Sequence, residues 1–117
     1  MKSIILSAAL ALVVAVPALG APGPDTIRGT SGPDDLRGGN SPDVIYGLGG
    51  DDIIHGNKGP DKEYGGPGDD HLSSFGSGEV SDLVDGGSGW DVCRVTRNDI
   101  VRACEVVKVR KGLGPRR

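Results

Sequence analysis

Aspartates recur along this sequence at a fixed step of nine residues. An unbroken series is followed by an insertion of three residues and then by two more aspartates nine apart: Asp25, Asp34, Asp43, Asp52, Asp61 and Asp70, then Asp82 and Asp91. Residues 21–91 carry 14 acidic side chains against four basic ones, a balance of -10. Carboxylate oxygens are the ligands that hard divalent cations prefer. The first chemistry to consider is therefore cation binding.

Each aspartate is the sixth place of a nine-residue unit, and the stretch from Gly47 to His55 is one such unit. Glycine recurs at the first and fourth places, where it predicts tight turns with positive φ, because other residues adopt that conformation at a cost. Places seven to nine predict a short strand whose aliphatic middle residue faces inward, since side chains alternate along a strand. With only 3% aromatic residues, the predicted interior is a thin stack of small aliphatic side chains.

The pattern G-G-x-G-x-D-x-U-x, with U aliphatic, resembles the calcium-binding nonapeptide repeats of the RTX, or hemolysin-type, family. Its best matches are Gly65–Ser73 and Gly86–Arg94, and the resemblance covers roughly residues 20–94. The resemblance implies an all-β fold, a parallel β-roll (β-solenoid) with two short-stranded sheets. Alternate units then lie in opposite sheets, and residues eighteen apart become neighbours. The resemblance also implies folding triggered by calcium.

In such a roll the aspartates stack along two edges, where like charges repel one another. Ca²⁺ between successive turns would reverse the sign of that interaction, since it accepts six to eight oxygens from carboxylates and backbone carbonyls, whereas Mg²⁺ demands stricter octahedral geometry. We therefore expect Ca²⁺ as the cofactor. The predicted ligands are Asp34, Asp43, Asp52, Asp61, Asp70 and Asp91, with Asp25, Asp82, Asp51 and Asp69 as weaker candidates.

Two other interpretations of the repeats remain open. Aspartate in a glycine-rich segment is often only a turn residue, because its side chain bonds the nearby backbone. The chain could also be disordered, which is what we expect of it without calcium, since a thin core cannot offset the ordering entropy and the repulsion.

Two stretches depart from the pattern. Glu63 stands at an eighth place, where a buried carboxylate is costly unless Lys58 or Lys62 pairs with it or the strand is distorted. Residues 73–81 lack the paired glycines and contain the insertion, so we expect a loop that bulges from the solenoid.

The two ends of the sequence differ in character from residues 21–91. Residues 1–20 form a predicted signal peptide, with an apolar segment at 4–16 and cleavage after Gly20 or, alternatively, Ala18; a membrane anchor is the other interpretation. Residues 92–109 are predicted to form a β-hairpin cap with its turn at Asn98-Asp99. Residues 110–117 are a predicted disordered basic tail.

The hairpin register would place Cys93 opposite Cys104, which allows a disulfide in an exported protein. No nucleophile elbow, Ser/His/Asp arrangement or phosphate loop is present, so we expect no enzymatic activity.

The predicted function is that of a secreted, extracellular calcium-ion-binding repeat protein that folds on binding calcium and has a structural or interaction role. An accessory secretion or folding module for a separate exported enzyme or toxin is the alternative. The expected partners are calcium ions; we expect neither nucleic acid nor stable membrane insertion, and the sequence identifies no protein partner.

Overall fold

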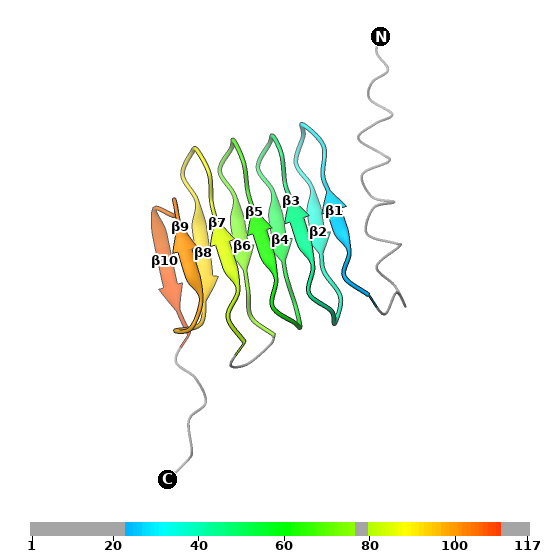
Figure 1. Ribbon diagram of the computed structural model, residues 1–117. Coiled ribbons are helices and arrows are strands. Elements are labelled where there is room, and N and C mark those ends of the chain that lie inside the picture. The colour runs from blue at the N-terminus through cyan, green and yellow to red at the C-terminus, as the bar shows by residue number, and fades with distance from the viewer. Residues whose placement is uncertain (1–22, 77–79, 111–117) are drawn as a thin grey trace.

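The computed structural model describes residues 23–76 and 80–110, and every helix or strand within those ranges is a short β-strand (Figure 1). The predicted signal peptide and residues 111–117 of the predicted tail lie outside the described residues. The strands are β1 (Thr26–Arg28), β2 (Asp35–Arg37), β3 (Val44–Tyr46), β4 (Ile53–His55), β5 (Lys62–Tyr64), β6 (His71–Ser73), β7 (Leu83–Asp85), β8 (Val92–Val95), β9 (Ile100–Arg102) and β10 (Val106–Val109).

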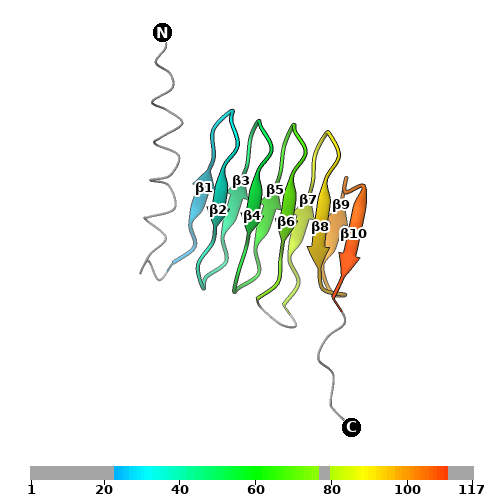
Figure 2. The same ribbon diagram turned by 180° about the vertical axis from the view of Figure 1, so that it is seen from behind.

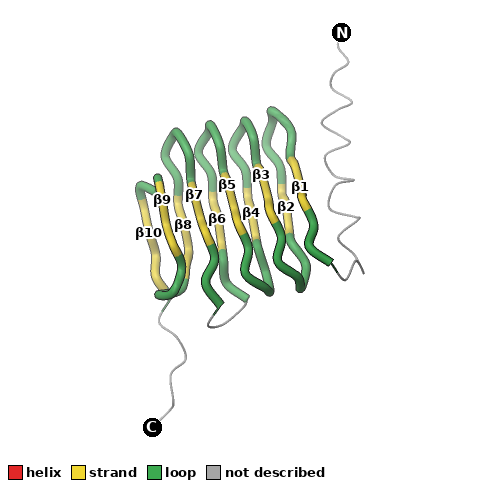
Figure 3. Tube along the Cα trace, viewed as in Figure 1, coloured by secondary structure: helices red, strands yellow, loops and turns green. Residues whose placement is uncertain are grey.

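Successive strands alternate between two sheets that face each other, as the front and back views show (Figures 1 and 2). One sheet has the order β1-β3-β5-β7-β9 and the other the order β10-β8-β6-β4-β2, and all neighbouring strands pair in parallel. Loops connect the strands at both ends of the roll (Figure 3). The predicted parallel β-roll is therefore confirmed.

The register between neighbouring strands follows the sequence period. Ile27 pairs with Ile45, and Ile45 pairs with Glu63, at a step of eighteen residues. Across the insertion, Glu63 pairs with Val84, so the step grows to 21 residues without a change of register. The loop between β6 and β7 therefore absorbs the extra residues, as predicted, although residues 77–79 of that loop lie outside the described part of the chain.

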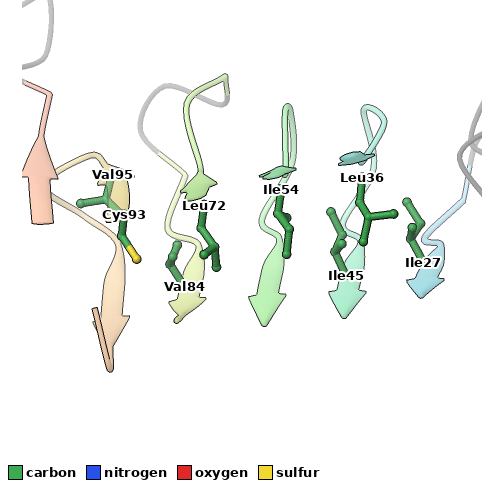
Figure 4. Packing of buried hydrophobic residues seen from close by; sticks show 8 residues of the cluster. All are labelled: Ile27, Leu36, Ile45, Ile54, Leu72, Val84, Cys93 and Val95. Carbon is green, nitrogen blue, oxygen red and sulfur yellow. The ribbon is translucent and has the colours of Figure 1, made fainter. Parts of the chain in front are cut away.

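The core consists of eighth-place side chains stacked between the two sheets, with Val95 added at the end of β8 (Figure 4). In each strand from β1 to β7 the middle side chain is buried and its neighbours are more exposed, as the alternation predicts. The buried apolar residues are Ile27, Leu36, Ile45, Ile54, Leu72, Val84, Cys93 and Val95. Because this core is one side chain thick, each coil depends on the coils on either side of it.

The turns use glycine for two different reasons. Gly50, at a fourth place, has a φ of +87°, as predicted. The expectation of positive φ at the first place is wrong: Leu48 and Asn57, both at second places, adopt φ values of +70° and +69° instead. First-place glycines are needed for close approach, since a Cβ on Gly47 would lie only 2.5 Å from the Asp52 Oδ2 atom and 2.7 Å from the Gly65 carbonyl oxygen.

The predicted β-hairpin cap at residues 92–109 is wrong. Strand β9 pairs in parallel with β7, and β10 pairs in parallel with β8, so this segment forms one more coil of the solenoid. A hairpin would join β8 to β9 and leave the edge of β7 unpaired, whereas the parallel arrangement extends both sheets. The edge strands at this end of the roll are then β9 and β10.

The predicted disulfide is present, but it does not cross a hairpin. Cys93 lies in the core at the eighth place of β8, and Cys104 lies in the connection between β9 and β10. Their Cα atoms are 6.0 Å apart. The bridge therefore ties the last coil to the core stack.

Reduction of this disulfide should lower the free energy of unfolding by about 2–3 kcal/mol, because the bridge closes a loop of only about a dozen residues in the unfolded chain. Urea unfolding in saturating calcium, followed by far-UV circular dichroism with and without a phosphine reductant, measures the difference. A Cys93→Val, Cys104→Ser double variant should match the reduced protein. An unchanged urea midpoint in both cases would show that the last coil is stable without the bridge.

Candidate metal centre

Two ladders of carboxylates run along the roll, one beside each sheet. In each ladder the backbone amide of a sixth-place residue donates a hydrogen bond to a side-chain oxygen of its counterpart one coil further on. The Asp52 amide, for example, donates to Asp70 Oδ1 at 2.8 Å, and the Asp43 amide donates to Asp61 Oδ1 at 2.9 Å. The first ladder is Asp25, Asp43, Asp61, Asp82 and Asp99. The second ladder is Asp34, Asp52, Asp70, Asp91 and Glu105.

The second carboxylate oxygen changes its environment along the ladders. Near the start of the roll Asp34 Oδ2 accepts a hydrogen bond from the Thr30 amide at 2.6 Å, and Asp43 Oδ2 accepts one from the Gly39 amide at 2.7 Å. Further along, this oxygen is buried and has no hydrogen-bond partner among the described residues. The residues with such an oxygen include Asp52, Asp61, Asp70 and Asp91. Buried polar atoms nearly always have a partner, so these oxygens mark positions where one is required.

Backbone carbonyl oxygens lie beside these unpartnered oxygens. The position of a Cβ on Gly65 would be 2.5 Å from Asp70 Oδ2 and also 2.5 Å from the Gly86 carbonyl oxygen. The same arrangement recurs at Gly47 with Asp52 Oδ2 and the Gly65 carbonyl oxygen. Each of these two turns thus brings one carboxylate oxygen and one carbonyl oxygen to the same place, which is the donor set that Ca²⁺ accepts.

The protein itself does not neutralise the ladder charges. Burial raises the pKa of Asp52 to about 7, that of Asp61 to about 8 and that of Asp70 to about 6. At each carboxyl the amide hydrogen bond from the preceding coil lowers the pKa, whereas the neighbouring ladder carboxylates raise it further. The pKa of Asp91 is also raised, chiefly by burial. Either protonation of these carboxyls or a bound cation would remove the free-energy cost of burying their negative charge.

The structure places all the sequence-predicted sixth-place residues on the two ladders, including Asp25 and Asp82. Asp51 and Asp69, the weaker candidates at fifth places, lie on the exposed side of the turns instead. The Asp69 amide donates to Asp51 Oδ1 at 2.9 Å, and the Trp90 amide donates to Asp69 Oδ1 at 2.8 Å. These two residues therefore form a separate, exposed row.

Sequence reasoning missed two members of the ladders, Asp99 and Glu105. The Asp82 amide donates to Asp99 Oδ1 at 2.9 Å, and the Asp91 amide donates to Glu105 Oε1 at 2.8 Å. The spacing signal fails here, because the step shrinks from nine residues to eight and then to six. A local signal was present: each acidic residue directly precedes a strand that begins with two β-branched residues, as Asp43 and Asp52 do.

Side chains alone do not build a metal site in this structure. Within residues 23–76 and 80–110, no group of three or more His, Cys, Asp or Glu side chains could hold a metal ion. A cation on the ladders must therefore take part of its coordination from backbone carbonyls, such as those at Gly65 and Gly86. His55 and His71 lie on strands at outward-facing places, and burial followed by the charge of Arg37 lowers the pKa of His55.

These observations define a class of protein: a parallel β-roll with carboxylates stacked at nine-residue turns. The family model described as RTX calcium-binding nonapeptide repeat (4 copies) matches residues 19–41 and 28–63. Residues 19–63 therefore carry RTX calcium-binding nonapeptide repeats, and the structure extends the same strand and carboxylate geometry beyond the matched residues. No curated protein and no solved structure gives a match. Among the described residues, no helix has the length and apolarity needed to cross a membrane.

Proposed function

We propose that this chain is an exported calcium-binding protein that completes its fold on binding calcium and serves a structural or interaction role outside the cell. The observation that carries the proposal is the repeated, buried carboxylate oxygen without a hydrogen-bond partner, seen at Asp52, Asp61 and Asp70. A stack of such oxygens destabilises the roll unless positive charge reaches it.

The proposed ligands are the sixth-place carboxylates Asp34, Asp43, Asp52, Asp61, Asp70 and Asp91, with Asp25 and Asp82 nearer the interruptions of the array. Bound Ca²⁺ supplies positive charge between carboxylates of successive coils. The chain contributes Oδ2 of each ladder aspartate and the carbonyl oxygens of first-place residues, while Oδ1 stays on the backbone amide of the preceding coil. Since an unfolded chain holds none of these groups together, binding free energy becomes folding free energy.

Export is supported by two features of the chain. Residues 1–20 have the composition of a signal peptide, and a disulfide joins Cys93 to Cys104. Disulfides persist in oxidising compartments, where free calcium also reaches the millimolar concentrations that weak extracellular sites require. We propose no catalytic activity.

Calcium titration of the purified, oxidised chain tests the proposal. We expect the far-UV circular dichroism spectrum to change from coil to β-sheet as calcium rises towards roughly 1 mM, the range of extracellular calcium modules. Magnesium at the same concentrations is the control and should produce a much smaller change, because Mg²⁺ demands near-ideal octahedral geometry and gives up its waters reluctantly. A coil-like spectrum up to about 10 mM calcium would contradict calcium-driven folding, and full β-structure in chelator would show that the fold does not need the ion.

A further inference from the structure

Glu63 interrupts the apolar core of the roll. It occupies the eighth place of β5, between Ile45 and Val84 in the sheet, and its exposed fraction is 0%. Neither carboxyl oxygen has a hydrogen-bond partner among the described residues. The strand is not distorted, because its pairing with β3 and β7 keeps the regular register. A buried carboxyl with no partner is costly, so its retention in the core needs a physical reason.

Among the described residues, no basic side chain forms an ion pair with this carboxyl. The sequence suggested Lys58 or Lys62, but Lys62 lies on the exposed face of β5, and the ion pair found among the described residues joins Arg37 to Asp35. Tyr64 does not fill the core in place of Glu63 either, since its ring stacks on that of Tyr46 with centroids 5.1 Å apart.

The Glu63 side chain reaches towards the first ladder. Its Oε1 atom is 2.7 Å from the position that a Cβ on Gly56 would occupy, and Asp61 Oδ2 is also 2.7 Å from that position. At Gly47 and Gly65 the second oxygen found there is a backbone carbonyl from the next coil. Glu63 therefore supplies a carboxylate oxygen at the place where these two coils supply a carbonyl oxygen.

The surroundings of Glu63 are strongly acidic. The side chain is buried, and the carboxylates that act on it are those of Asp61, Asp82 and Asp99. Without a cation, negative charge is less well tolerated here than at a site that holds one aspartate and a carbonyl group.

We propose that Glu63 is a calcium ligand, which joins Asp61 Oδ2 in a site of higher charge than the other turns provide. This inference rests on the proposed function and adds to it a residue that the repeat pattern does not assign. Two carboxylates at one site attract a hard divalent cation more strongly than one carboxylate and a carbonyl. This turn should therefore bind calcium most tightly and be occupied first.

Two substitutions test the role of Glu63 in the full, oxidised chain. Glu63→Gln keeps the shape and removes the charge, and Glu63→Val restores the aliphatic residue found at the same place in Val84. We expect both to weaken the tightest calcium-binding step, measured by isothermal titration calorimetry, by at least about tenfold, equivalent to about 1.4 kcal/mol. The matched control is Asp35→Asn, which removes an exposed carboxylate from β2 and should leave that step unchanged.

The outcomes separate the inference from the proposed function. If wild type and the Glu63 variants bind calcium equally tightly, Glu63 is a neutral buried acid and the inference fails while the proposed function stands. If wild type binds no calcium, the proposed function fails. A second readout is the ¹³C NMR shift of the Glu63 side-chain carboxyl, assigned with Glu63→Gln among only three glutamates. In saturating calcium this carboxyl should be ionised at neutral pH, and a protonated carboxyl would overturn the inference.

Discussion

Without calcium, the β-roll should lose stability as the pH rises from about 4 to about 8, and saturating calcium should reverse this dependence. Most globular proteins with paired carboxylates lose stability in acid. The opposite sign is expected here because the ladder carboxyls are buried without cationic partners. This reversal is the clearest solution signature of the two ladders.

The sign follows from the direction of the pKa shifts. The pKa values of Asp70, Asp52 and Asp61 are raised in the folded chain to about 6, about 7 and about 8 from 3.8. Between the unfolded and folded pKa values the folded chain binds more protons, so the free energy of unfolding falls as pH rises. The stability given by protonation is complete below about 4 and is lost as pH passes through the folded values.

Bound calcium should invert this linkage. Ligand carboxylates must be ionised to bind the ion, so their pKa values in the folded, calcium-loaded chain fall below the unfolded value. Their contribution is then present above about 4 and is lost only as pH falls through the lowered pKa values. Calcium binding should also release protons at neutral pH.

Because the chain is expected to be largely coil in chelator at neutral pH, its folded fraction by far-UV circular dichroism at stepped pH measures the first dependence. Urea unfolding at stepped pH in calcium measures the second. One pKa unit corresponds to about 1.4 kcal/mol. Because the ladder carboxyls interact and solvent screens them, we expect a net loss of only about 3 kcal/mol in chelator. The lowered pKa of His55, caused by burial and then by Arg37, contributes in the opposite direction below about 6.5. Rising stability from pH 4 to 8 in chelator would contradict the unpartnered ladders.

The core and most of each ladder could be predicted from sequence because both follow one period. A step of nine residues with two units per coil places Ile27 on Ile45 and Asp34 on Asp52, as found. The alternation within each three-residue strand then determines which side chain is buried. The nine-residue step is a property of the sequence, whereas the two units per coil are what the resemblance to the repeat family implies.

The last coil could not be predicted in the same way. Its units are shorter than nine residues, and the alternating strands around Asn98-Asp99 have the local pattern of a hairpin. Parallel pairing of β9 with β7 and of β10 with β8 prevails because it continues both sheets and both ladders through Asp99 and Glu105. The environment of Glu63 could not be predicted from the sequence either, because it depends on how this side chain lies relative to the turn at Gly56.

Replacement of Asp52 by asparagine should have opposite effects on stability with and without calcium. In chelator the variant should be more stable than wild type by about 1–2 kcal/mol, the typical cost of a buried polar group without a partner. In calcium it should be less stable, and the calcium concentration at the folding midpoint should rise by at least about tenfold, since losing a charged ligand costs more than about 1.4 kcal/mol.

The stabilising effect in chelator and the destabilising effect in calcium arise from what the substitution does at the two side-chain oxygens. Asparagine retains Oδ1, which accepts the Asp34 amide at 2.9 Å in the wild type. Its amide group replaces the buried Oδ2, next to the Gly65 carbonyl oxygen, and can donate a hydrogen bond to it. The variant therefore satisfies the site without a cation, and by the same change it removes the charge that a cation needs.

Asp51→Asn is the matched control, because Asp51 is the preceding residue, is exposed and keeps an oxygen for the Asp69 amide. Its stability in chelator should stay within about 0.5 kcal/mol of wild type, as for most surface substitutions, and its calcium midpoint should barely move. Calcium titrations, urea unfolding in calcium and the folded fraction in chelator at low pH give all the values needed for the three proteins. Equal shifts of the calcium midpoint in the Asp51 and Asp52 variants would show that the exposed row also binds calcium. An unchanged midpoint in the Asp52 variant would show that the second ladder does not bind calcium.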